Sequence, residues 1–151
     1  MFTIKIDDKA LARKLNHLAK QIEDLEPMFD LFAPYIQGEL DDQFKHERDV
    51  YGVNWQPLKP ETIAQKRKAG KIEKIMQRDG YLRDSAVTQA MKQSFVAGFD
   101  TDYGEFHHSK IHRAKGVPRR RLLPDPEEGL PKGWQDELEA ALGDFLKQAW
   151  Q

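Results

Sequence analysis

The residues best suited to metal binding or proton transfer lie in one segment, 105–112. They are Glu105, His107, His108 and His112. On a helix, the glutamate and the last two histidines would share one face at spacings that suit a divalent metal. However, Lys110 and Arg113 lie in the same stretch and would repel a cation, and no second acidic or histidine cluster completes a metal shell. We interpret the segment as a solvated loop or a histidine-mediated contact between subunits, without a metal.

The other polar residues fit no catalytic pattern. Ser85 and Ser94 lack the strand-to-helix turn that exposes a serine nucleophile. Paired carboxylates such as Asp41 and Asp42 fall on the polar side of a predicted helix, and no glycine-rich phosphate-binding motif is present. The chain contains no cysteine, which excludes disulfides, thiolate zinc sites and cysteine nucleophiles. We predict a protein that is not an enzyme and needs no cofactor.

Clustered basic residues support a different hypothesis, the non-specific binding of nucleic acid. They are Lys66, Arg67, Lys68, Lys71, Lys74, Arg78 and Arg119 to Arg121. Such a surface contacts phosphates without reading the base sequence. The formal net charge of −1 gives no general attraction to DNA, and no helix-turn-helix, zinc finger or stacking platform accompanies the cations. A non-specific nucleic-acid-binding accessory protein therefore remains the alternative function.

Charge is unevenly distributed near the C-terminus. The stretch 110–121 contains six lysines and arginines and no acid, whereas 125–139 is strongly acidic. Two surfaces of opposite sign would suit head-to-tail contact between copies of the chain. The simpler reading is two solvated faces. The absence of cysteine fits a reducing cytoplasm, and no stretch approaches the roughly 18 apolar residues of a transmembrane helix. We expect no membrane contact.

The N-terminal third predicts a strand followed by two helices. Apolar and polar residues alternate over Met1–Asp8, which is typical of a half-buried strand. A helix with a single apolar stripe follows, and the stripe consists of Leu11, Leu15, Leu18, Ile22 and Leu25. A second helix begins near Pro27 and ends near Glu47, and Pro34 inside it should kink or split it.

The centre of the chain predicts an irregular loop, a short helix and a hairpin. Trp55 lies in the loop 49–59 and is either the anchor of that loop in the core or a partner contact. A basic helix opens at Pro60 and closes at Gly70. Segments 85–91 and 95–99 favour two hairpin strands, although the first would also accept a helix. The candidate inward residues are Val87, Met91, Phe95, Ala97 and Phe99.

The last third ends in a clear amphipathic helix. Val117–Leu123 reads as a short strand or extended edge, which Pro118 excludes from the centre of a sheet. Asp125 then begins one helical turn, and Gly129 stops it. The apolar side of the C-terminal helix carries Trp134, Leu138, Ala141, Leu142, Phe145, Leu146 and Ala149. Together these elements predict an α+β fold, with central antiparallel strands, in a single domain of residues 1–151.

Four blocks along the chain resemble, in the same order, those of the phage virion morphogenesis family, which covers Mu-like virion morphogenesis and tail-completion proteins. The blocks are GVNWQPL at 52–58 followed by Pro60, Thr62 and Lys66, then Asp79–Leu82 with Ser85, then Val96–Phe99 with Tyr103 and His107, and finally Val117–Leu123. The last block departs from the family pattern, because Arg119 and Arg121 replace a small residue and a second proline.

The resemblance implies a structural protein of the virion that completes the tail or joins head and tail through contacts with other virion proteins. It also implies a homo-oligomeric ring, with a hexamer favoured because phage tails have sixfold symmetry. The protein would assemble in the host bacterial cytoplasm and reside in the virion. The candidate contact residues, each of which could instead be intramolecular, are Trp55, Tyr103, His107, Arg119, Arg120 and Arg121.

Overall fold

The structure is a computed structural model that describes residues 3, 9–111 and 115–151. Its elements are α1 (Lys9–Gln21), α2 (Glu26–His46), α3 (Pro60–Lys68), α4 (Tyr81–Asp84), β1 (Ala86–Ala90), β2 (Phe95–Phe99), α5 (Gly104–His108) and α6 (Lys132–Trp150). This order of helices and a central antiparallel hairpin confirms the α+β prediction. The strand predicted at Met1–Asp8 lies outside the described residues.

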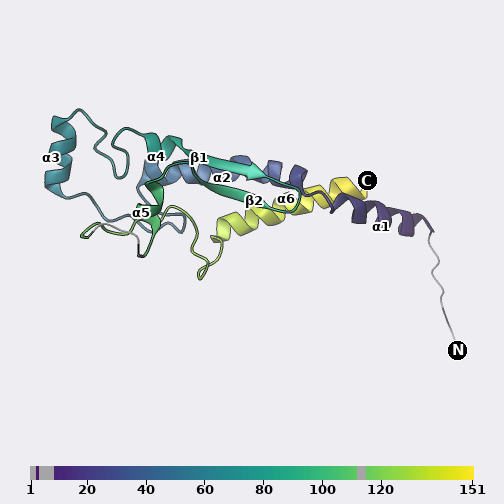
Figure 1. The fold of residues 1–151 in the computed structure, drawn as a ribbon. Coiled ribbons are helices and arrows are strands. Elements are labelled where there is room, and N and C mark those ends of the chain that lie inside the picture. The colour runs from purple at the N-terminus through teal and green to yellow at the C-terminus, as the bar shows by residue number, and fades with distance from the viewer. Residues whose placement is uncertain (1–2, 4–8, 112–114) are drawn as a thin grey trace.

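Helix α2 is the central element of the fold (Figure 1). Its buried residues recur every fourth position, from Met28 through Ile36 to Phe44, so one stripe along the helix enters the core. Pro27 occupies the first turn, where its missing N–H costs nothing. Of the two predicted effects of Pro34, a kink or a split, the split is wrong, because α2 continues through the proline. Apolar residues on both sides of the proline pack in the same core, which offsets the lost backbone hydrogen bond.

The hairpin lays one face on α2. Ala86 pairs with Phe99, and Ala90 pairs with Phe95, in an antiparallel register. Phe95 contacts Phe32 of α2 edge-to-face, with ring centroids 5.2 Å apart. The predicted inward position of Val87 is wrong, since this side chain is 48% exposed. Ala86 lies on the inner face instead. Because side chains along a strand alternate between its two faces, an error of one residue places every side chain on the wrong face.

A second apolar cluster extends the core beyond the end of α2. It consists of Phe44, Trp55, Ile75, Leu82 and Leu122. Trp55 is 5% exposed and packs edge-to-face on Phe44 at 5.5 Å between ring centroids. This position confirms Trp55 as the anchor of its loop. The cluster fixes three long connections that regular secondary structure alone would not hold.

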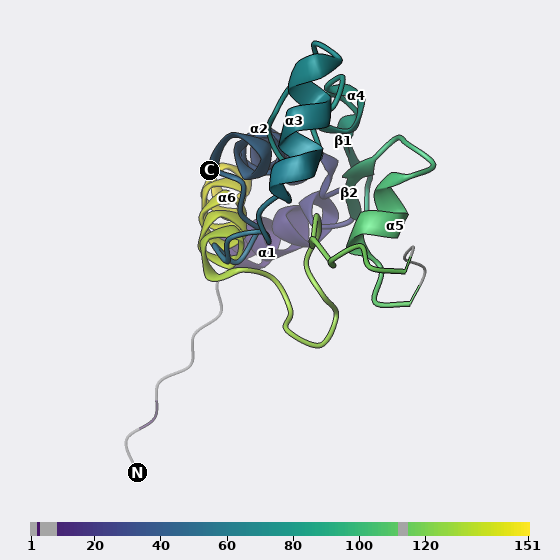
Figure 2. The ribbon, with the colours of Figure 1, turned by 90° about the vertical axis from the view of Figure 1, so that its left-hand side faces the viewer.

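The two terminal helices differ in burial: α6 contributes several residues to the core, whereas α1 contributes none. Helix α6 buries Trp134, Ala141, Phe145 and Ala149, as the sequence predicted. Helix α1 packs against the C-terminal part of α6 but buries no residue completely. It projects from one end of the molecule, whereas α3, α4 and α5 gather at the other end (Figures 1 and 2). Most of the predicted α1 stripe therefore remains in contact with solvent.

The segment 117–123 forms no strand. Of the two predicted alternatives, a short strand or an extended edge, the strand is wrong, because the segment runs over the second cluster without pairing to another strand. Leu122 O accepts a hydrogen bond from Gln43 Nε2 at 3.0 Å. The predicted turn after Asp125 is present, since Glu128 N and Gly129 N both donate to Asp125 O. No helix of the described residues has the length and apolar character needed to cross a membrane.

Candidate functional site

The side chains of three consecutive arginines, Arg119 to Arg121, reach different partners. Arg119 and Arg121 reach the same carboxylate, that of Asp125. Arg120 points elsewhere, and its Nε and Nη2 donate to Gln56 O at 3.1 and 2.8 Å. It is 5% exposed. The segment therefore contributes to two different environments, an ion-pair cluster and a pocket.

Asp125 is the centre of the ion-pair cluster. Arg119 Nη2 lies 2.6 Å from Asp125 Oδ1, and Arg121 Nη1 lies 3.2 Å from Oδ2. Arg121 also donates to Asp49 Oδ2 at 2.8 Å and to Glu128. The prediction that basic and acidic segments face different copies is therefore wrong for these residues, because their charges meet within one subunit.

Backbone groups and one tyrosine hold this cluster in place. Asp49 Oδ1 accepts hydrogen bonds from the backbone N–H of Tyr51 and Val53, both at 2.9 Å. The Tyr51 ring lies 4.6 Å from the Arg121 guanidinium, and its hydroxyl donates to Gly129 O at 2.6 Å while accepting from Asp125 N. Trp55 Nε1 donates to Arg121 O at 3.0 Å. The aspartates thus orient the loops as well as balance charge.

Strong acid should weaken this cluster. Hydrogen bonds from Arg119 lower the pKa of Asp125 to about 2, and although burial acts in the opposite direction, Arg121 lowers the pKa further. Because the folded-state pKa lies below the ordinary value, the stabilisation is complete above about pH 4 and disappears as the pH falls to about 2. The shift corresponds to about 2 kcal/mol. In urea denaturation, the difference in stability between the natural protein and Asp125→Asn should shrink over this range; a constant difference would contradict the assignment.

The histidine segment lies against the arginines. Helix α5 ends at His108, and His112 lies outside the described residues. His108 Nδ1 accepts a hydrogen bond from Leu122 N at 3.2 Å, which places the proton of the neutral ring on Nε2. Burial lowers the pKa of His108, and Arg119 lowers it further. The described residues contain no cluster of three potential metal ligands, and the role of this segment in a subunit contact stays a prediction.

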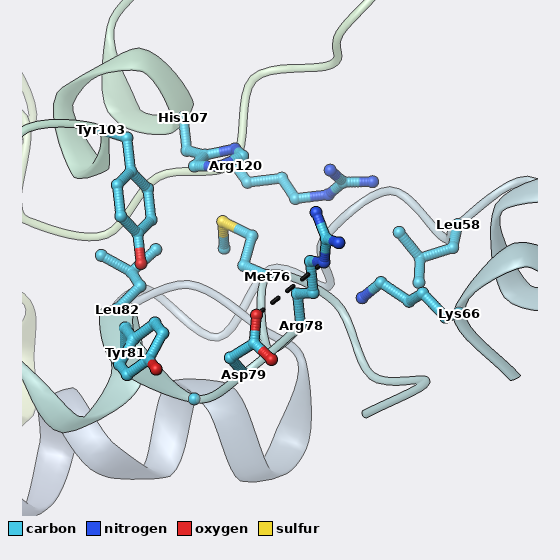
Figure 3. A pocket seen from close by; sticks show the side chains of 11 residues that line it. Leu58, Lys66, Met76, Arg78, Asp79, Tyr81, Leu82, Tyr103, His107 and Arg120 are labelled. Carbon is cyan, nitrogen blue, oxygen red and sulfur yellow. Dashed lines mark ion pairs between the residues drawn. The ribbon is translucent and has the colours of Figure 1, made fainter. Parts of the chain in front are cut away.

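A pocket of about 390 Å³ opens on the other side of the arginine segment, between α3, α4 and α5. Figure 3 shows Arg120 and His107 above Met76, with Lys66 and Leu58 on one side and the two tyrosines on the other. The complete lining is Leu58, Lys66, Met76, Arg78, Asp79, Gly80, Tyr81, Leu82, Tyr103, His107 and Arg120. Three cations and one acid give this pocket a positive charge.

A comparison with known protein families shows which family this chain belongs to. The model of the phage virion morphogenesis family matches residues 6–149. The chain belongs to this family. No curated protein and no solved structure matches it. Membership of the phage virion morphogenesis family gives the chain a structural role in the assembly of the phage particle.

The structure of this family member divides the predicted contact residues into two groups. Tyr103, His107 and Arg120 come together in the pocket. Trp55, Arg119 and Arg121 lie in or beside the ion-pair cluster. Burial of Trp55 and Arg120 turns the first into an internal anchor and leaves the second reachable only through the pocket. Contact with a partner stays a prediction for all six.

Sequence reasoning missed the two aspartates that neutralise the arginines. The sequence pattern places Asp125 at the start of a helical turn and in an acidic stretch, and it places Asp49 at the edge of a loop. A signal for Asp49 is the spacing Asp-x-x-Gly, which is typical of a turn that the aspartate side chain closes. Nothing in the spacing connects Asp49 to Arg121, which lies 72 positions away.

Proposed function

We propose that this protein completes the tail or joins head to tail, by forming a ring of identical copies that contacts other virion proteins. The observation that carries the proposal is the exposed apolar face of α1. Leu11, Leu15 and Ile22 are 41%, 50% and 46% exposed although they repeat at helical spacing. A projecting helix with an apolar stripe is costly in solvent and is typical of an interface.

A second copy is the occupant that the fold favours for this face. Beside α6 and β2 lies an apolar hollow of about 480 Å³, which is lined by Phe29, Phe32, Phe95, Ala97, Leu123, Pro124, Leu130, Trp134 and Leu138. A helix from one copy in a hollow of the next is a heterologous contact, which closes into a ring when the rotation between copies allows it. Sixfold closure would match the symmetry of a phage tail.

The charges support a protein interface more than a DNA interface. Among the proposed phosphate-binding residues, Arg67 pairs with Glu73 at 2.8 Å and Lys71 pairs with Asp79 at 2.5 Å. Arg119 and Arg121 are held by internal carboxylates. Cations that already have acidic partners gain less from phosphates and release fewer counterions. Non-specific nucleic-acid binding is therefore the weaker candidate.

Removing the gene during phage growth tests the function directly. We expect electron microscopy of the lysate to show filled heads and finished tails that are not joined, and infectivity to fall by several orders of magnitude. A plasmid copy of the natural gene should restore joined particles. Intact, infectious particles without the gene would overturn the proposal, and so would a block at head filling.

A further inference from the structure

The pocket between α3, α4 and α5 contains an unusual charge. Arg120 is 5% exposed, and its guanidinium donates two hydrogen bonds to a single carbonyl oxygen, that of Gln56. Within the described part of the chain, no carboxylate lies at ion-pair distance from it. Glu47 acts on Arg120 only from a longer distance, and its Oε1 accepts from Ile75 N at 2.8 Å. A buried guanidinium without a carboxylate partner is energetically costly, and an anion from another molecule would offset that cost.

Other groups in the pocket increase the demand for an anion. Lys66 Nζ donates to Lys74 O at 2.7 Å and has no carboxylate partner among the described residues. Burial lowers the pKa of Lys66, and the positive charge of Arg120 lowers it further. Asp79, the acid in the lining, is already paired with Lys71. It is also paired with Arg78, as Figure 3 shows. The cationic charge of the pocket is therefore not neutralised from within.

The shape of the pocket favours a protein carboxylate over a nucleic acid. Its walls include the apolar side chains of Leu58, Met76 and Leu82, and Tyr81 and Tyr103 line it as well. A duplex presents its phosphates on a broad convex surface and cannot bring one to a guanidinium recessed in a pocket. An acidic side chain next to an apolar one can enter, and it matches both the cations and the walls.

We propose that this pocket binds an acidic residue, flanked by an apolar residue, in a peptide segment of another virion protein. Arg120 and Lys66 hold the carboxylate, and Leu58, Met76 and Leu82 contact the apolar neighbour. The identity of the partner as a virion protein rests on the proposed function, whereas the binding itself does not.

Nuclear magnetic resonance titration with two matched dipeptides tests the pocket. The probes are acetyl-Leu-Glu-amide and acetyl-Leu-Gln-amide, which differ only in charge. We expect the glutamate peptide to bind at least tenfold more tightly, which is about 1.4 kcal/mol, and to shift the signals of His107, Met76 and the Arg120 side chain. Lys66→Gln should weaken binding about tenfold, whereas Lys68→Gln, an exposed position on the same helix, should leave it unchanged.

Three results would overturn the proposal. They are equal binding of the two peptides, signal shifts that map away from the pocket, and tighter binding of inorganic phosphate than of the glutamate peptide. If the Arg120→Gln variant still folds, as judged by its spectrum, it should lose the preference for the glutamate peptide. If that variant does not fold, the Lys66→Gln variant tests the proposal instead. Failure of this titration leaves the gene-removal experiment unaffected, so the pocket and the proposed function are judged separately.

Discussion

Replacing Leu15 by glutamate is expected to dissociate the proposed ring of identical copies. Leu15 lies in the middle of the exposed stripe of α1 and is 50% exposed in the single chain. Burial of a leucine at an interface contributes about 2 kcal/mol, and a buried glutamate without a partner adds a desolvation cost. The dissociation constant should therefore rise at least about a hundredfold.

Light scattering after size-exclusion chromatography measures this change across a range of concentrations. Asn16→Glu is the matched control, since Asn16 lies on the opposite, polar side of α1 and is also exposed. The control should keep the mass of the proposed oligomer, and both variants should remain folded, because α1 buries no residue completely within the single chain. A natural protein that stays monomeric at every concentration, or equal masses for the two variants, would refute the role of this face.

Asp125→Asn should produce the largest loss of stability among single charge changes in this chain. Asp125 is 4% exposed and accepts from Arg119 at 2.6 and 3.2 Å and from Arg121 at 3.2 Å. Asparagine keeps the volume but removes the charge. Arg121 retains Asp49 and Glu128, whereas Arg119 retains, among the described residues, the carbonyl of His108. We expect the free energy of unfolding to fall by about 3 kcal/mol.

Urea denaturation followed by circular dichroism measures this loss at neutral pH. Glu127→Gln provides the comparison two residues away. Glu127 pairs with Lys110 at 3.3 Å, and the glutamate side chain is 70% exposed, so its removal should change stability by no more than about 0.5 kcal/mol. If the two substitutions lower the free energy of unfolding equally, the buried Asp125 cluster stabilises the fold no more than an exposed ion pair does.

The helices and the hairpin could be predicted from the sequence because their signals are local. The period of apolar residues in α2 and α6 specifies both the helix and its buried face. The proline and glycine around α3 mark its ends. The hairpin strands were predicted, but the inner face of β1 was not, since Ala86 and Val87 are both apolar and only packing on α2 selects between them.

The arginine segment and the pocket depended on tertiary structure. The sequence showed three adjacent arginines and several later acids, but it did not show that Arg121 meets Asp49 or that Arg120 donates to the carbonyl of Gln56. Those contacts join residues tens of positions apart, and the buried cluster around Trp55 and Leu122 decides them. Local sequence thus determined which helices form and their apolar stripes, because helical periodicity is a property of neighbours. Long-range packing alone decided which charges are neutralised and which one remains available, because ion pairing depends on distances that the fold sets.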